Sequence, residues 1–322
     1  MGKRGLSSFF GRSLQQPKQK KAKDEKIMWL ADQWKDYRLI DSADGEKLEY
    51  WGNYLLRRPD PQAVWTEKKE ERLWKQTDAW YHRSSSGGGK WQFFNKKMPE
   101  RWTVHYGDLT FHIKPMGFKH TGLFPEQAVN WDWFSGLIRD AGRPIRVLNL
   151  FAYTGGATVA ALAAGAEVVH VDASKGMVTW AKENVVSSGL GDRSVRYIVD
   201  DVKKFVAREA RRGREYDGII MDPPSYGRGP SGEVWKIENE LYPLVLECMK
   251  ILSPKPLFFL INSYTTGLSA AILNNVLTMT LKRRYGGIVS ADEIGLPMEA
   301  SGLTLPCGIS GRWRAEDGRN DR

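Results

Sequence analysis

From Gly122 onward, short apolar segments alternate with segments whose apolar residues recur at helical spacing, and this alternation limits the possible folds most. Strands that alternate with crossover helices form a parallel sheet covered on both faces. The sequence therefore predicts an α/β fold, a doubly wound and mostly parallel Rossmann-like sheet with a small mixed extension before it. The predicted strands are 146–150, 168–172, 195–199, 218–222 and 257–261, and the predicted helices are 128–138, 157–164, 177–186, 202–211, 241–252 and 270–284. Residues 287–290 and 303–309 are expected to close the sheet as a terminal hairpin.

The part of the chain before this alternation divides into two predicted regions. In residues 1–26, seven Lys and Arg residues and no acid precede Asp24, which is typical of a disordered basic tail. Residues 27–102 predict a small α+β extension: strands and hairpins over 27–59 and an amphipathic helix over 63–81. A further hairpin is predicted from residue 103 around Gly107-Asp108, and the main α/β domain is assigned to 103–318.

Charge and tryptophan are concentrated in the front of the chain. The formal net charge is +10, and residues 1–104 contribute +8 of it, with 22 Lys and Arg against 14 Asp and Glu. Eight of the 13 tryptophans also lie there. Cations release counterions from phosphates and indoles stack on exposed bases, so this composition favours an RNA partner. The alternative is that the charge serves solubility and the tryptophans fill a core.

Ligands of doubly wound sheets bind beyond the carboxyl ends of the strands, so the strand ends are where we look for chemistry. The first strand runs into a turn with Gly155 and Gly156, where helix N–H groups can face a ligand. This turn lacks the GxGxxG pattern of dinucleotide sites. The second strand ends in Asp172, which can accept the hydroxyls of a ribose or cap the next helix. The third ends at Asp200-Asp201, where an acid can accept an adenine amino proton or again form a cap.

The fourth strand ends in Asp222-Pro223-Pro224-Ser225-Tyr226, the most distinctive of these segments. Two prolines fix the backbone angle φ and hold their carbonyl groups in place, ready to accept a hydrogen bond from a planar amino group. Tyr226 offers a face on which a base can stack, and Asp222 adds a charged acceptor. An ordinary loop between a strand and a helix rarely contains this combination.

Together these segments resemble the class I S-adenosylmethionine-dependent methyltransferases. The closest resemblance is to the bacterial large-subunit ribosomal RNA methyltransferase group, whose motifs are LFAYTGG and DPPxF. The matching elements cover about Thr103 to Trp313, in the family's order. Beside the strand ends, they include Thr121–Gln127 before the first strand and Leu305–Gly308 near the end. Asn149 stands where the wider family has an acid, and Phe151 and Tyr153 stand where it has glycines, as in the ribosomal RNA group.

The resemblance implies a cofactor, S-adenosyl-L-methionine, and a role for each matching residue. Phe151, Thr154, Gly155 and Gly156 are expected around its methionine part, Asp172 at the ribose, Asp201 with Val202 at the adenine, and Phe124 with Gln127 closing over the site. Asp222, Pro223 and Tyr226 are expected to face the methyl acceptor as catalytic residues. Residues 103–318 would then be the methyltransferase domain, acting on RNA, ribosomal RNA in particular.

The two cysteines bear on which atom receives the methyl group. Attack through C5 of a pyrimidine needs a cysteine thiolate, and neither Cys248 nor Cys307 lies at a strand-end motif. We therefore favour methylation at a nitrogen, where hydrogen bonds to Asp222 and the Pro223 carbonyl would restore lone-pair character.

Other functions compete with this interpretation. They are methylation of a protein or small molecule, a noncatalytic RNA-binding assembly factor with the same fold, and a dehydrogenase using NAD, which the missing GxGxxG disfavours. The histidines lack ligand spacing, so no metal is expected. No apolar stretch approaches the eighteen or so residues of a membrane span, so we expect a cytoplasmic protein without a membrane partner. The sequence leaves the oligomeric state open.

Overall fold

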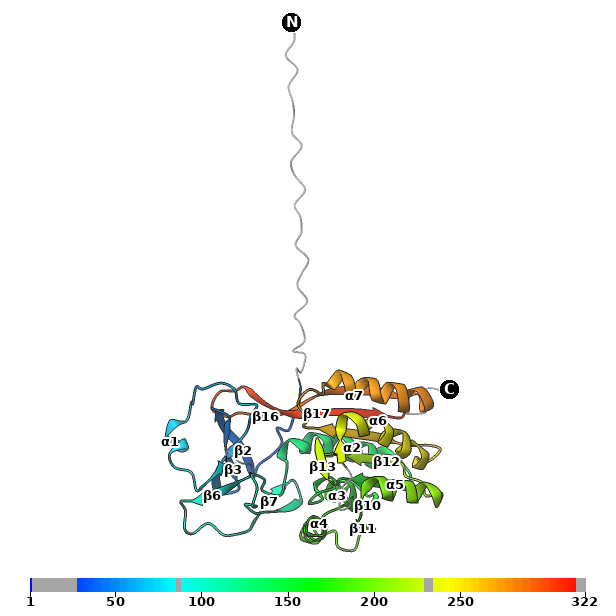
Figure 1. Cartoon of the computed structure of the whole chain (residues 1–322), viewed down its shortest axis with the longest axis horizontal. Helices are drawn as coiled ribbons and strands as arrows, with labels where there is room; N and C mark the ends of the chain where they lie inside the picture. Colours follow the sequence, from blue (N-terminus) through cyan, green and yellow to red (C-terminus); the bar gives the residue numbers. More distant parts are fainter. Residues whose placement is uncertain (2–27, 85–87, 229–233, 317–322) are drawn as a thin grey trace.

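The computed structural model describes residues 1, 28–84, 88–228 and 234–316. Apart from Met1, the predicted basic tail (1–26) lies outside the described residues, as do the last positions of the predicted main domain. Within the described range, a large α/β layer structure and a smaller sheet lie side by side (Figure 1).

The main sheet has eight strands, five of which form a continuous parallel block. The predicted doubly wound, mostly parallel sheet is thereby confirmed. The predicted terminal hairpin is also present, because β16 and β17 pair antiparallel at one side of the block. In spatial order the strands are β1 (Trp29–Leu30), β16 (Ile288–Pro297), β17 (Thr304–Arg314), β15 (Phe258–Ser263), β12 (Gly218–Met221), β9 (Arg146–Leu150), β10 (Glu167–Asp172) and β11 (Val195–Val199).

Helices cover both faces of this sheet, because successive strand residues point to opposite sides. Val147 belongs to a core shared with α2, α3 and α4, whereas its neighbour Leu148 belongs to a second core shared with α5, α6 and α7. Both side chains are fully buried, which explains why the central strands are apolar throughout. The helices are α2 (Ala128–Asp140), α3 (Gly156–Ala163), α4 (Lys175–Ser187), α5 (Val202–Arg211), α6 (Ile237–Cys248), α7 (Ala270–Leu277) and α8 (Arg283–Tyr285). Single turns of other helix types are η1 (Pro125–Gln127), η2 (Met249–Ile251) and η3 (Thr278–Lys282).

The strand order reverses at β9. The chain continues from β9 to β10 and β11 on one side, then crosses back to form β12 and β15 on the other. The carboxyl ends of β9 and β12 are therefore neighbours and diverge into different connections, which is where such sheets form a ligand crevice.

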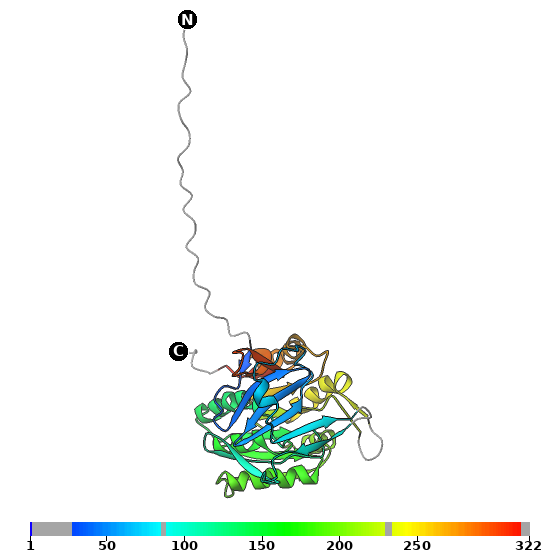
Figure 2. The same ribbon diagram turned by 90° about the vertical axis from the view of Figure 1, so that its left-hand side faces the viewer.

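The front of the chain forms a five-stranded sheet of β2 (Tyr37–Ala43), β3 (Glu46–Trp51), β4 (Tyr54–Pro59), β5 (Ala79–Arg83) and β6 (Gly89–Phe93). The predicted turns are present: Asp44 and Gly45 have positive φ angles of 54° and 73°. The hairpin of β7 (Trp102–Tyr106) and β8 (Leu109–Ile113) follows, also as predicted. Figures 1 and 2 show that β16 and β17 extend toward this sheet.

The hydrophobic core runs without a break from the smaller sheet into the main one. Leu39 and Trp51 share a cluster with Trp131 and Leu296, and β1 pairs with β16. The division at residue 102 between an extension and a methyltransferase domain therefore stays a prediction.

The predicted helix over 63–81 is wrong in most of its length. Only α1 (Glu71–Trp74) is helical, and the end of the segment is strand β5, which pairs in parallel with β4. The carboxylate of Asp41 explains the difference: it accepts hydrogen bonds from the backbone N–H groups of Lys69 and Glu70 and from the indole of Trp74. This long-range contact holds the segment in an irregular path that the local apolar spacing does not reveal.

Most of the tryptophans at the front of the chain serve packing. Trp51 is fully buried, and six other indoles donate hydrogen bonds to groups distant in sequence. The pairs are Trp34 with the Pro125 carbonyl, Trp65 with the Ser42 carbonyl, Trp74 with Asp41, Trp80 with Glu46, Trp91 with the Met116 carbonyl and Trp102 with the Trp51 carbonyl. The alternative considered from the sequence, that the tryptophans fill a core, is therefore correct for most of them.

Phe258 provides a test of the core beneath the crevice. Its ring is fully buried, stacks on Phe134 with ring centres 5.8 Å apart, and lies where a side chain at Gly218 would stand. We expect Phe258→Ala to lower the free energy of unfolding by about 3–5 kcal/mol. Leu303→Ala, at a residue 64% exposed, should change it by about 0.5 kcal/mol at most. Urea unfolding followed by circular dichroism measures the free energy of unfolding of both variants. If Phe258→Ala lowered it as little as Leu303→Ala does, this account of the core would be contradicted.

Candidate active site

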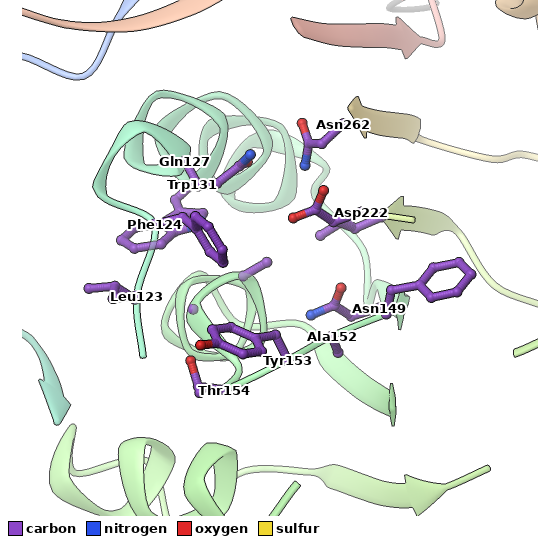
Figure 3. A pocket seen from close by; sticks show the side chains of 14 residues that line it. Leu123, Phe124, Gln127, Trp131, Asn149, Ala152, Tyr153, Thr154, Asp222 and Asn262 are labelled. Carbon is purple, nitrogen blue, oxygen red and sulfur yellow. The ribbon is translucent and has the colours of Figure 1, made fainter. Parts of the chain in front are cut away.

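A cavity opens at the strand-order reversal, beyond the carboxyl ends of β9, β12 and β15. Its volume is about 430 Å³ including its open mouth. Figure 3 shows Asp222 and Asn262 reaching it from neighbouring strand ends, with Phe124 and Tyr153 on the other side. The lining residues are Leu123, Phe124, Gln127, Trp131, Asn149, Phe151, Ala152, Tyr153, Thr154, Gly156, Ala157, Ile220, Asp222 and Asn262.

The turn after β9 has an unusual backbone. Phe151, Tyr153 and Gly155 all have positive φ angles, of 53°, 50° and 84°. For residues other than glycine this conformation costs about 1–3 kcal/mol each and occurs mainly where the surroundings enforce it. The positions where the wider family has glycines are thus the positions that adopt the glycine conformation. The bulky side chains contribute contacts in return: the Phe151 ring lies 5.3 Å from that of Trp235, and the Tyr153 ring 5.5 Å from that of Phe124.

Asp172, at the end of β10, holds this turn in place. One carboxylate oxygen accepts a hydrogen bond from the backbone N–H of Tyr153 at 2.9 Å, and the other from that of Ser174 at 2.8 Å. A carboxylate has about four acceptor sites, so Asp172 can also accept the hydroxyl groups of a ribose. Its acceptor oxygens therefore fit the hydroxyl groups of a nucleoside cofactor, although its side chain is not among those lining the cavity.

The two glycines of the turn are required by packing. A β-carbon at Gly155 would lie 2.8 Å from the β-carbon of Ala181, and one at Gly156 would lie 2.7 Å from the ring of Trp131. These glycines let α3 pack closely between α2 and α4. Of the two, only Gly156 lines the cavity.

An aromatic lid covers the cavity on the side of the predicted closing residues. The Phe124 ring lies 5.5 Å from the rings of both Tyr153 and Tyr264. Gln127 donates a hydrogen bond to the Tyr264 hydroxyl at 2.6 Å and accepts one from Asn130 at 2.9 Å. The structure thus brings the Thr121–Gln127 segment onto the strand ends from outside the sheet.

Asp222 lies on the opposite side of the cavity. Burial, and then the nearby carboxyl group of Glu126, raise the pKa of Asp222 from its ordinary value of 3.8 to about 7. Near neutral pH this carboxyl group is therefore present in both its protonated and its ionised form, as suits a group that must accept a proton or a hydrogen bond. Neither Pro223, which is buried, nor Tyr226, which is half exposed, lines this cavity.

The rest of the diproline segment is tied into a small hairpin of β13 (Tyr226–Arg228) and β14 (Val234–Lys236), which the sequence did not suggest. The Pro224 carbonyl accepts a hydrogen bond from the indole of Trp235 at 2.6 Å, and Ser225 bonds to Thr265. The first of the two proline carbonyls, that of Pro223, is therefore the one left for the acceptor role we predicted.

Asp201 and Val202 lie farther from the cavity. Asp201 caps α5 by accepting a hydrogen bond from the backbone N–H of Lys204 at 2.9 Å, which is the capping alternative raised from the sequence. Val202 packs in the second core beside Phe205. Their adenine-binding role stays a prediction.

Sequence reasoning missed Asn262, near the carboxyl end of β15, and Tyr264, just after this strand. The same rule of inspecting strand ends would have found them. Both belong to a buried polar network that extends across the sheet: Asn130 donates to Asn262 and Ser310, and Arg312 donates to Asn130. This network orients Gln127 and Asn262 in the cavity, because each shares a hydrogen bond with Asn130.

The cysteines lie outside this cavity. Cys248 is fully buried in the second core, and burial raises its pKa. Cys307 lies on β17, and burial, followed by Glu126, raises its pKa well above the ordinary value. Neither thiol is poised as a nucleophile, in line with the preference for a nitrogen acceptor. In the described part of the chain no group of three or more potential ligands could hold a metal ion, and no helix is long and apolar enough to cross a membrane.

Comparisons with known proteins agree with this geometry. Residues 69–241, more than half of the chain, match the family described as S-adenosylmethionine-dependent methyltransferase. A crystal structure of an S-adenosylmethionine-dependent methyltransferase from Agrobacterium tumefaciens superposes with a TM-score of 0.85 and 38% sequence identity, over 90% of this chain and 94% of that one. A putative methyltransferase, SMU.776, solved with S-adenosylhomocysteine, shares the fold with a TM-score of 0.66 at 17% identity, over 88% of this chain and 76% of that one.

Among curated proteins, the chain is similar to ribosomal RNA large subunit methyltransferase K/L. Identity is 31% over 170 residues for the protein of Shewanella frigidimarina and 28% over 216 residues for that of Shewanella baltica strain OS195. These matches cover 52% and 66% of this chain, but only 23% and 28% of the relatives. The chain thus spans about a quarter of the length of the curated proteins it matches.

The close packing of the turn can be tested at Gly155. Gly155→Ala places a β-carbon against Ala181 in a left-handed backbone, whereas Gly165→Ala, also at a positive φ, meets nothing within 4 Å. We expect Gly165→Ala to cost about 1–2 kcal/mol of unfolding free energy from backbone strain alone. Gly155→Ala should cost about 1–3 kcal/mol more, because it also overpacks the site. Urea unfolding compares the two variants, and equal costs would show that backbone strain alone requires glycine at 155.

The raised pKa of Asp222 makes a prediction about stability and pH. Between about pH 4 and pH 7 the folded protein binds a proton at Asp222 that the unfolded chain has released, so this residue lowers stability as the pH rises through that window. Asn cannot ionise. The melting temperature of Asp222→Asn, relative to the unchanged protein, should therefore be higher at pH 8 than at pH 5.5, as measured by differential scanning fluorimetry. If the difference in melting temperature between Asp222→Asn and the unchanged protein were the same at both pH values, the raised pKa of Asp222 would be contradicted.

Proposed function

Because the chain belongs to the S-adenosylmethionine-dependent methyltransferase family, we propose that it transfers the methyl group of this cofactor to a base of RNA, ribosomal RNA in particular, at a nitrogen. The observation that carries the proposal is that Asp222 of the diproline segment faces the same cavity as the turn from Phe151 to Gly156. The names of the curated relatives, which are ribosomal RNA methyltransferases, support the choice of acceptor. On this proposal the protein acts in the cytoplasm.

The cofactor contacts follow from the strand ends. Phe151, Thr154, Gly155 and Gly156 would hold its methionine part, and Asp172, which has acceptor sites to spare, would hold the ribose. Asp201 and Val202 would hold the adenine from the end of β11. Phe124 and Gln127 would close the site against water, through the ring contacts and the hydrogen bond to Tyr264 described above. When bound, the cofactor supplies an activated methyl group on a sulfonium.

The residues of the diproline segment would prepare the acceptor. An amino nitrogen conjugated with a base is weakly nucleophilic. Hydrogen bonds from it to the Asp222 carboxylate and the Pro223 carbonyl would localise its lone pair and hold it in line, and Tyr226 would stack on the base. Positioning of two reactants can contribute about 7–11 kcal/mol toward lowering a barrier. The carboxylate would also offset positive charge that develops on the nitrogen.

The test is mass spectrometry of nucleosides from digested ribosomal RNA of a deletion strain and its parent. We expect one methylated nucleoside to be missing from the deletion strain and to return with the unchanged gene. Asp222→Ala should not restore it, because loss of the acceptor group lowers transfer by about 100-fold or more. Isothermal titration calorimetry should show that Asp222→Ala still binds S-adenosylhomocysteine, which separates loss of chemistry from loss of the cofactor site. Identical nucleosides in both strains would overturn the RNA acceptor while leaving the family assignment intact.

A further inference from the structure

A second cavity lies beside the first, where the smaller sheet meets the aromatic lid. Its volume is about 710 Å³ including its mouth. Residues from β3 and β4 form one wall, and the segment before η1, the loop after β15 and β17 form the other. The lining residues are Lys47, Arg58, Pro59, Asp60, Pro61, Gln62, Lys119, His120, Leu123, Phe124, Pro125, Glu126, Tyr264, Thr266 and Cys307.

Three cations face this space. Lys47 pairs with Asp60 at 3.2 Å, and both side chains are nearly buried. Arg58, also nearly buried, pairs with Glu49 beneath the wall and donates from Nη1 to the Lys119 carbonyl at 2.9 Å. Lys119 has no carboxylate within 4.0 Å among the residues described. The remaining acid, Glu126, is buried, and that burial raises its pKa.

Lys119 is thus the cation of this cavity that has no paired carboxylate in the described part of the chain. Burial of a cation costs several kcal/mol unless a partner compensates it. Asp60 and Glu49 pair directly with Lys47 and Arg58, whereas in the described range Lys119 has no such ion pair and feels Asp60 only from a greater distance. Burial, and then the positive charge of Lys47, lower the pKa of Lys119. His120 carries no charge near neutral pH, because burial and the surrounding cations lower its pKa to about 4.

The two cavities share a wall. Leu123 and Phe124 line both cavities. The centre of the Phe124 ring lies 5.3 Å from that of the His120 ring, which lines the second cavity, and 5.5 Å from that of the Tyr153 ring, which lines the first. Glu126 lines the second cavity and acts on Asp222 in the first. A group bound between Lys47 and Lys119 is therefore one side chain away from the proposed acceptor site.

We propose that this second cavity binds a backbone phosphate of the RNA that carries the acceptor base, with Lys119 as its principal partner and Lys47, Arg58 and His120 around it. This inference rests on the proposed function, since it names where that substrate is held. A phosphate gives Lys119 the paired negative charge that it lacks, and lysine binds phosphate as a point charge. His120 adds a neutral N–H donor, while Phe124 separates the phosphate from the reacting groups.

The test compares Lys119→Met with Lys255→Met, which removes the same charge from an exposed loop before β15, at the other end of the strands. Steady-state methylation of RNA at several salt concentrations gives kcat and KM. We expect Lys119→Met to raise KM for RNA about 10-fold with kcat nearly unchanged, and to reduce the salt dependence of RNA affinity by about one phosphate contact. Lys255→Met should change KM less than about 2-fold. Lys119→Arg, which keeps the positive charge, should leave KM for RNA close to that of the unchanged protein.

Calorimetry with S-adenosylhomocysteine separates the alternatives. If Lys119→Met weakens binding of this ligand and leaves KM for RNA unchanged, the cavity holds the carboxylate of the cofactor and the inference is wrong. If it changes neither, the inference is also wrong, while the proposed function stands.

Failure of the proposed function has a different signature, namely that the unchanged protein methylates no RNA. The cavity is then judged by titrating the four nucleoside 5′-monophosphates and the matching nucleosides into protein saturated with S-adenosylhomocysteine. Binding of a monophosphate that is lost in Lys119→Met supports the phosphate site. Equal binding of nucleoside and monophosphate, or none of either, overturns it.

Discussion

The hydrogen bond from the Tyr153 backbone to Asp172 is the contact on which the arrangement of the site depends. It ties the turn after β9 to the end of β10, and with the bond from Asn184 to the Thr154 carbonyl it holds two aromatic residues in a left-handed backbone. Strain of this kind persists only where the surroundings enforce it. The gain is that Phe151 and Tyr153 carry rings where glycine would carry none, and those rings reach Trp235 and Phe124. One acid thereby shapes the turn and still has acceptor sites to offer a ribose.

The second constraint is that the lid of the site is held between the two sheets. The segment from Lys119 to Gln127 passes between them, contacts Arg58 on the smaller sheet, and places Phe124 over the carboxyl ends of the main strands. Trp34 and Trp91, from the front of the chain, donate hydrogen bonds to this segment and to the Met116 carbonyl before it. The smaller sheet is thus a structural support for the lid, and it supplies two of the three cations of the second cavity, Lys47 and Arg58.

Local patterns were reliable where local forces decide the structure. The apolar runs predicted β9, β10 and β12 closely, because these strands are buried on both faces. The run also predicted β11, although this edge strand is partly exposed. The turn residues Asp44-Gly45 predicted the hairpin of β2 and β3 through their positive φ angles. The helix expected over 63–81 failed because Asp41, distant in sequence, binds its backbone. The sequence did not point to Asn262 and Tyr264, because the predicted strand ends at Ile261. In the structure β15 continues to Ser263, so the buried Asn262 is a strand-end group.

The sequence by itself determined the strand–helix alternation, the polar groups at the strand ends and the family resemblance, since these depend on the order of residues along one stretch of chain. Only the tertiary structure decided which of those groups meet. Asp222, Phe124 and Gly156 line one cavity, whereas Asp201 caps a helix and most of the early tryptophans fill a core. Lys47 and Arg58 are direct partners across the β3–β4 hairpin, which local turn residues encode. Only folding brings Lys119 to them, because the segment that carries it is distant in sequence and is held against Arg58 by a long-range hydrogen bond.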